Sequence, residues 1–215
     1  MSLVFHYHPL SSFCHKALIA LYENDVAFTP KIVDLGDSGQ RAEFLVLWPI
    51  GKFPVLQDPG EGRTIPESSI IIEYIDQRYP GKNRLIPDDP AQAREVRLRD
   101  RFLDLYVHEP MQKIVGDRLR PEGAKDAHGV DHARKTMRTA LGMLEKDMVS
   151  RIWAAGEAFS LADCAAAPAL FYADKVMPIA DDYPNLTRYL ARLRERPSYA
   201  RVLREAQPYF SMFPG

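Results

Sequence analysis

The sequence predicts two domains, an α/β domain with the element order β-α-β-α-β-β-α followed by an all-α helical bundle. Three observations lead to this prediction. Residues 1–79 alternate short β-prone runs with segments of helical periodicity. Residues 80–90 contain three prolines and a glycine, which a helix does not easily accommodate, so this segment is the predicted linker. Residues 91–215 show long helical patterns and no convincing strand.

Each element of the first domain follows from a local pattern. The expected elements, in chain order, are a strand at 3–7, a helix through 14–21, a strand at 26–33, a helix at 41–48, strands at 53–56 and 63–65, and a helix at 68–79. The first strand is β-prone and stops at His8-Pro9, and the first helix has apolar residues at i, i+3, i+4 and i+7. Ser11 and Ser12 stand just before that helix, where N-caps occur. The last two strands flank a turn at 58–60.

The second domain is expected to be entirely helical. Its helical patterns, in chain order, lie at 91–119, 131–148, 161–176, 185–194 and 198–206. The third pattern is rich in alanine and poor in charge, so we expect this helix to be buried on all sides and to bend at Pro168. Ser160 and Asp163 have the spacing of an N-capping box at its start, which predicts a structural role and no catalytic one.

Composition excludes several classes of function. The chain has 215 residues, of which 46% are hydrophobic and 27% charged, as in ordinary globular domains. Its 28 basic and 29 acidic residues give a net charge of −1, which argues against nucleic acid as a partner. The longest stretch without Asp, Glu, Lys or Arg, residues 1–15, holds three histidines and a proline. We therefore expect no signal peptide, no membrane association and a cytoplasmic location.

No metal site and no disulfide framework are predicted. His128 and His132 have i, i+4 spacing, but Gly129 interrupts the helix and no acidic ligand motif accompanies them. Cys14 and Cys164 lack a Cys-x-x-Cys partner, and both are expected to be buried structural cysteines. The alternating charges between residues 94 and 104 are interpreted as a solvated helix face, with a dimer rim as the alternative.

Three segments of the chain together resemble the cytosolic glutathione S-transferases. They are residues 7–16 (YHPLSSFCHK), residues 51–56 (GKFPVL) with 66–75 (PESSIIIEYI), and residues 159–163 (FSLAD). In this order and at these spacings the resemblance covers essentially the whole chain, and the first segment is similar to bacterial, serine-type members with theta- or zeta-like motifs. The resemblance implies a thioredoxin-like, glutathione-binding domain over 1–79. It also implies a helical domain over 91–215 that carries the electrophile site and the contacts of a homodimer.

The resemblance implies a glutathione site on the second segment. In the family, the proline that matches Pro54 follows a cis peptide bond, and the backbone of Phe53 can then pair with an extended peptide like an added strand. Ser68 begins a helix whose N-terminus would hold the γ-glutamyl carboxylate. Glu67 would receive the ammonium group of the ligand, and Lys52 would meet the glycyl carboxylate. The alternative is that Ser68 only caps its helix and that Lys52 is a solvated surface charge.

The first segment supplies the expected thiol donor. A thiol with a pKa of about 8.5 is only about 3% ionised at pH 7, and a hydrogen bond to the charged sulfur favours ionisation. Ser11 is the expected donor, because residues 11–14 resemble the Ser-x-x-Cys of theta-like members. Tyr7, at the end of the first strand, and Ser12 are the alternative donors. Phe13, in the same segment, is a further expected glutathione contact.

The predicted function is therefore glutathione S-transfer, in which the activated thiolate attacks a small apolar electrophile held between the domains. The residues expected to line the electrophile pocket are Tyr7, Leu10, Tyr106 and Met111, and the alternative for Tyr106, which shares a helix face with Leu103 and Val107, is core packing. Glutathione is a co-substrate, and no metal or organic cofactor is expected. Two alternatives remain open: a non-catalytic glutathione-binding module with the same fold, and a thiol reductase that depends on Cys14. The second arises because Cys14 falls in the first turn of a helix, where the dipole lowers a thiol pKa.

Overall fold

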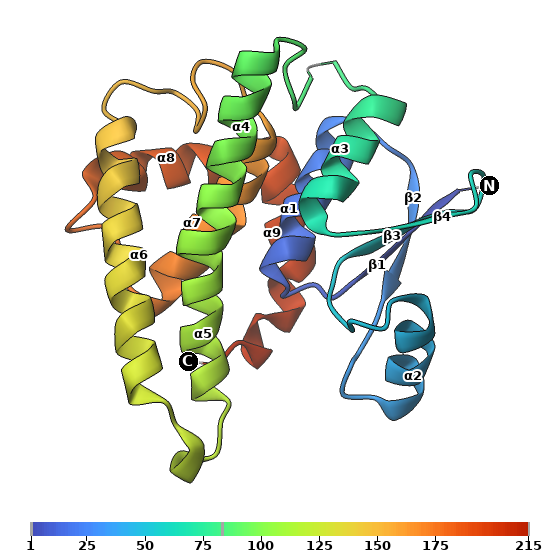
Figure 1. Ribbon diagram of the computed structural model, residues 1–215, viewed down its shortest axis with the longest axis horizontal. Coiled ribbons are helices and arrows are strands. Elements are labelled where there is room, and N and C mark those ends of the chain that lie inside the picture. Colours follow the sequence, from blue (N-terminus) through green and yellow to red (C-terminus); the bar gives the residue numbers. More distant parts are fainter. Residues whose placement is uncertain (1, 83, 215) are drawn as a thin grey trace.

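The computed structural model describes residues 2–82 and 84–214. A small sheet with its helices lies beside a larger group of helices, and the two parts meet along α1 (Ser12–Glu23) (Figure 1). None of the helices within the described residues is both long enough and apolar enough to span a membrane.

The first part of the chain has the predicted β-α-β-α-β-β-α order. Its elements are β1 (Leu3–Tyr7), α1, β2 (Phe28–Ile32), α2 (Ser38–Leu47), β3 (Val55–Asp58), β4 (Arg63–Pro66) and α3 (Ser68–Arg78). The strands form a sheet in the order β2-β1-β3-β4, in which β1 and β2 are parallel and the other pairs are antiparallel. This mixed sheet with its helices confirms the expected thioredoxin-like domain.

The second part of the described chain consists of helices. They are α4 (Pro90–Leu103), the π-helical turn η1 (Asp104–His108), α5 (Glu109–Arg118), the 3-10 turn η2 (Glu122–Ala124), α6 (Ala127–Asp147), α7 (Leu161–Val176), α8 (Pro184–Glu195), α9 (Pro197–Ala206) and the 3-10 turn η3 (Gln207–Met212). The expected helical domain is therefore confirmed. As predicted, the alanine-rich helix α7 is buried on nearly all sides.

The two parts of the chain share a large apolar core, and a smaller cluster around Phe44 lies within the α/β domain. Helix α1 contacts α3 in its own domain and α7 and α9 in the other, so nearly all of its central residues are buried. Phe5 of the sheet, Leu18 of α1 and Leu170 of α7 belong to the same buried cluster. Because α1 is shared in this way, its N-terminal end is held firmly at the boundary between the domains.

The predicted helix over 91–119 is divided by η1. In this turn the Glu109 N–H donates to the carbonyl of Asp104, a bond that spans five residues instead of four. Figure 1 shows α4 and α5 following one another as one long rod. Because a π-turn adds a residue, the helix after it is rotated relative to an uninterrupted α-helix, and π-turns occur often at functional sites.

The capping box at the start of α7 is present, and its carboxylate is fully used. Asp163 accepts hydrogen bonds from the backbone N–H groups of Ser160 and Ala154, at 2.9 and 2.8 Å, and from the hydroxyls of Ser160 and Tyr189. The Asp163 carboxyl is also buried. It therefore serves the fold and has no group free for chemistry.

Candidate functional site

A cleft of about 730 Å³ opens between the α/β domain and the rod formed by α4 and α5. The first domain lines it with Ser11, Phe13, Gly51, Lys52, Phe53, Pro54, Glu67, Ser68, Ser69, Ile70 and Glu73. The helical domain lines it with Arg97, Asp100, Arg101, Asp104, Leu105, Glu109 and Gln112. The expected thiol donor and all of the expected glutathione contacts thus lie on one cleft, although they come from three separate stretches of sequence.

The segment before β3 forms one edge of the cleft. The Phe53–Pro54 peptide bond is cis. Among the described residues, neither the N–H nor the C=O of Phe53 has a backbone partner, because β3 begins only at Val55. The Phe53 ring packs against Phe44 of α2, with ring centres 4.9 Å apart. The backbone at Phe53 is therefore fixed by packing and can still pair with an extended ligand.

The N-terminus of α3 forms the next part of the cleft. Ser68 is the first residue of this helix and is 5% exposed. Glu67 precedes it with φ 68° and ψ 119°, and its side chain makes no capping hydrogen bond. A residue other than glycine at positive φ costs of order 1–3 kcal/mol, and such strain is concentrated at ligand sites. The first N–H groups of α3 are left without helical partners and favour a negative charge in the cleft.

Ser11 is the N-cap of α1, and its position allows it to cap the helix and to donate to a thiol at the same time. Its Oγ accepts a hydrogen bond from the Cys14 N–H at 3.4 Å. A hydroxyl can accept and donate at the same time, so capping leaves the Ser11 O–H free to donate into the cleft. Ser12, one of the alternative donors, is inside α1, is 4% exposed and does not line the cleft.

Tyr7, the other alternative donor, lies elsewhere. Its ring stacks on Phe5, two residues earlier on the same face of β1, with ring centres 5.4 Å apart. Together with Tyr22 and Phe28, Tyr7 lines a separate cavity of about 530 Å³. Burial, together with the negative charge of Glu205, raises the pKa of Tyr7 and makes it a weaker donor. The structure therefore does not bring Tyr7 to Ser11.

The other residues expected in the electrophile pocket also fall outside the cleft. Met111 is 3% exposed and belongs to the core, while Tyr106 is 47% exposed and packs its ring on Phe102. Leu10 is half-buried and does not line the cleft. Tyr106 follows Leu105 by one residue, which turns it about 100° away from the cleft face of the helix, and Met111 packs in the core. The residues that this part of the rod presents to the cleft are Leu105, Glu109 and Gln112.

A buried ion cluster that no sequence pattern predicted lies beneath the cleft. Lys16 is fully buried, and its Nζ lies 2.6 Å from Asp100 Oδ1, 2.7 Å from Asp104 Oδ2 and 2.9 Å from Ser69 Oγ. Ser69 in turn donates to Asp100 Oδ2 at 2.7 Å. This Lys16 cluster ties α1 and the first turn of α3 to α4 and η1. Asp100 and Asp104 are thus buried partners of a cation, which corrects their interpretation as part of a solvated helix face.

His108 extends the cluster towards the cleft. Its Nδ1 lies 3.3 Å from Asp104 Oδ1, and its ring packs on Phe13 with centres 4.6 Å apart. Burial lowers the pKa of His108 in spite of this contact. Burial by itself would raise the pKa of Asp104, but the bond to His108 and the charge of Lys16 hold it below its ordinary value. Burial raises the pKa of Asp100 against the attraction of Lys16.

Cys14 is not placed for thiol chemistry. It is completely buried, and burial raises the pKa of its thiol to about 12, with only partial compensation from Ser11. A thiolate is the reactive form of cysteine, and almost none exists here near neutral pH.

The described residues contain no group of His, Cys, Asp and Glu that could hold a metal ion.

Comparisons with known proteins agree with this geometry. A family model described as the N-terminal domain of glutathione S-transferase matches residues 5–83, and the corresponding C-terminal domain model matches residues 102–197. FtsZ-localized protein A of Caulobacter vibrioides is 29% identical, over 94% of this chain and 91% of its own. Glutathione S-transferase GstB of Escherichia coli K12 is 27% identical, over 75% of this chain and 78% of its own. A crystal structure of a glutathione S-transferase from Methylobacillus flagellatus with glutathione bound has a TM-score of 0.85 and 29% identity, and the match covers 94% of this chain and 98% of that one.

Proposed function

Because the chain belongs to the glutathione S-transferase family and is a glutathione transferase, we propose that its interdomain cleft binds glutathione and that Ser11 activates the thiol. One observation carries the proposal. The cleft brings together a free hydroxyl at Ser11, an unpaired backbone at Phe53 and a helix N-terminus at Ser68. These three groups match the thiol, the peptide and the γ-glutamyl carboxylate of one extended tripeptide.

In the proposed complex, each end of the tripeptide meets a charge of opposite sign. The γ-glutamyl carboxylate accepts from the first N–H groups of α3 and from the Ser68 hydroxyl. The exposed side chains of Glu67 and Lys52 are placed for the ammonium group and for the glycyl carboxylate. The crystal structure of the Methylobacillus relative with glutathione bound supports this ligand. No metal or organic cofactor takes part in the proposed reaction.

The proposed activation is a hydrogen bond from Ser11 to the sulfur. Lowering the thiol pKa by two units corresponds to about 2.7 kcal/mol, and a hydrogen bond to a charged group contributes about 1.5–3 kcal/mol. A more acidic thiol is also a weaker nucleophile, so ionisation alone increases the rate only a few-fold. The larger part of the rate must come from holding the thiolate beside the electrophile.

Binding tests the proposal directly. Ser68→Ala is expected to weaken glutathione binding by about 10–100-fold, because it removes a hydrogen bond to a carboxylate at the helix end. Titration calorimetry of native protein and variant with glutathione measures the effect. Ser160→Ala is a matched control, since this serine is the N-cap of α7 and does not line the cleft. A native protein that does not bind glutathione, or a Ser68→Ala variant that binds as well as the native protein, contradicts the proposed site.

A second candidate is a glutathione-binding module without transfer activity. It is favoured by one observation, that FtsZ-localized protein A is named for a localisation and not for an activity. The free Ser11 hydroxyl in the cleft favours the transferase instead.

We also propose a homodimer. Ile70 on α3 is 53% exposed and Leu98 on α4 is 58% exposed. The two helices are joined by the ion pair between Arg97 and Glu73. A partner subunit on this surface would cover both apolar side chains.

The reductase alternative makes a different prediction. Because the Cys14 thiol is buried and its pKa is raised to about 12, Cys14→Ala is expected to change turnover by less than about twofold. Turnover with glutathione and an aryl halide, measured beside a thermal melt, checks this. Cys164→Ala is the matched control, because Cys164 is equally buried but lies in α7 away from Ser11. Loss of turnover in Cys14→Ala alone, with the fold intact, would favour the reductase.

A further inference from the structure

One wall of the cleft is a stripe on α4, η1 and α5 that is mostly polar. In chain order its residues are Arg97, Asp100, Arg101, Asp104, Leu105, Glu109 and Gln112. Leu105 is the single aliphatic residue of this wall as the structure describes it. Ligand pockets for apolar molecules are lined mainly by hydrophobic and aromatic side chains. This wall is therefore poorly suited to the apolar electrophile that the sequence predicts.

Contacts between the domains show which end of the stripe faces which part of glutathione. Asp100 accepts a hydrogen bond from Ser69 in the first turn of α3, so the early part of the stripe faces the proposed carboxylate subsite. His108 packs on Phe13 in the first turn of α1, whose N-cap is the proposed thiol donor. Glu109 follows His108 and lines the cleft. Its carboxylate is therefore at the end of the cleft where the electrophile must meet the sulfur.

Glu109 brings an uncompensated negative charge to this end. The Glu109 side chain is exposed, and no ion pair or hydrogen bond of its carboxylate occurs among residues 2–82 and 84–214. Asp100 and Asp104, by contrast, both lie against the buried cation of Lys16. Arg101, also exposed, comes eight residues earlier, which is about 12 Å along a helix at 1.5 Å per residue. At that separation in a solvated cleft it does little to neutralise Glu109.

We propose that Glu109 determines electrophile specificity, and that this enzyme accepts small polar electrophiles that offer a hydrogen-bond donor and rejects those that carry a carboxylate. The inference rests on the proposed function of the same cleft and goes further by naming the class of second substrate. The Glu109 carboxylate accepts a hydrogen bond from the donor group of the electrophile. The amide of Gln112, about one turn later on α5, is a second polar contact. A carboxylate in the same place meets a like charge and binds poorly.

A matched pair of aryl chlorides tests the proposal, namely 4-chloro-3-nitrobenzamide and 4-chloro-3-nitrobenzoate. In both, the thiolate sulfur attacks the carbon that bears chlorine, the C–S bond forms, the C–Cl bond breaks, and chloride leaves with the bonding electrons. The thiol proton has already passed to solvent. Because the two rings differ in intrinsic reactivity, each enzymatic kcat/KM is divided by the uncatalysed rate constant with glutathione at the same pH.

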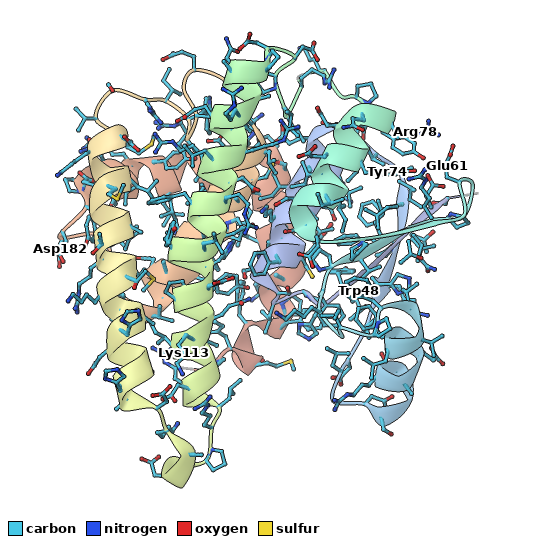
Figure 2. All side chains as sticks on the ribbon, viewed as in Figure 1. Trp48, Glu61, Tyr74, Arg78, Lys113 and Asp182 are labelled. Carbon is cyan, nitrogen blue, oxygen red and sulfur yellow. The ribbon has the colours of Figure 1, made fainter. Side chains whose placement is uncertain are left out.

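The native enzyme is expected to favour the amide over the benzoate by about tenfold after this correction, as like charges a few ångströms apart in a solvated cleft would produce. Glu109→Gln is expected to remove most of that preference by raising activity towards the benzoate. Glu61→Gln is the matched control, because Glu61 pairs with Arg78 at the outer edge of the α/β domain, away from the cleft (Figure 2). The control should keep the native ratio.

Three outcomes would overturn the inference. They are a native preference for the benzoate, an unchanged ratio in Glu109→Gln, and an equal change in Glu61→Gln. If neither chloride turns over, calorimetry with the two S-aryl glutathione conjugates measures the same preference as a ratio of dissociation constants, and equal constants overturn the inference. Glutathione that fails to bind the native enzyme contradicts the proposed function instead, so the two failures are distinguishable.

Discussion

Ser11→Ala is expected to lower kcat/KM for glutathione transfer near pH 7 only by about 2–4-fold, because the less ionised thiol is also the stronger nucleophile, and to leave glutathione affinity nearly unchanged. The substitution removes the proposed donor to the thiolate, and a hydrogen bond to a charged group contributes about 1.5–3 kcal/mol. The pKa of the bound thiol should therefore rise by about 1–2 units. Ultraviolet absorbance of the thiolate, followed against pH in the glutathione complex, measures this shift. The pH–rate profile should move to higher pH by the same amount.

The alternative donors supply the controls. Ser12→Ala changes a neighbouring serine that is buried within α1 and does not line the cleft, so the thiol pKa should stay at its native value. Tyr7→Phe removes the hydroxyl that lies in the other cavity and should likewise leave it unchanged. A raised thiol pKa in Tyr7→Phe, with a native value in Ser11→Ala, would make the assignment of the donor wrong. Because Ser11 is the N-cap of α1, Ser11→Ala should also lower the free energy of unfolding by about 1 kcal/mol.

Local sequence patterns were sufficient for the parts of the site that depend on neighbouring residues. An N-cap position and a helix start are each encoded within a few residues, and these patterns identified Ser11 and Ser68, whereas Pro54 lay inside the expected strand 53–56 and was singled out by the resemblance. The resemblance then supplied their common purpose. The structure adds that the three groups meet on one cleft, which no local pattern could establish.

The second wall of the cleft could not be predicted in this way, because helical periodicity does not say which face of the helix meets the other domain. Helical periodicity over 91–119 predicts an uninterrupted α-helix and does not contain the π-turn η1. The observed π-turn coincides with the point where Asp104 reaches Lys16 and His108. The contact with Lys16 joins the helix to α1 of the other domain, so the turn coincides with tertiary structure that helical periodicity does not contain.

One signal for the Lys16 cluster was present in the sequence. Lys16 directly precedes the apolar run 17–21 of the first helix, and a buried lysine requires a partner of opposite charge. Asp100 and Asp104 are spaced i, i+4, so both can face the same side of a helix. What the sequence lacked was the pairing itself, since 84 residues separate Lys16 from Asp100.

Lys16→Met is expected to lower the free energy of unfolding by about 3–5 kcal/mol, because it leaves Asp100 and Asp104 buried without a counter-charge. Urea unfolding measures the loss. Lys113→Met makes the same chemical change on α5 (Figure 2), where the partly exposed Lys113 pairs with Asp126 before α6 and the loss should be much smaller. An equal loss in the two variants would mean that the cluster does not hold the domains together.

The pH dependence of stability distinguishes loss of charge balance from loss of packing. In the native protein the pKa of Asp104 is held below its ordinary value, so the stability it contributes is present near neutral pH and is lost as pH falls through the folded pKa. In Lys16→Met the two buried carboxyls should have raised pKa values, so the folded state binds more protons than the unfolded one. Stability of the variant should then increase as pH falls from 7 towards 5, opposite in sign to the native contribution of Asp104. If Lys16→Met lowers the free energy of unfolding by the same amount at every pH, the effect of Lys16 comes from the packing of its methylene chain. A triple variant that combines Lys16→Met with Asp100→Asn and Asp104→Asn should recover stability only if charge is the cause.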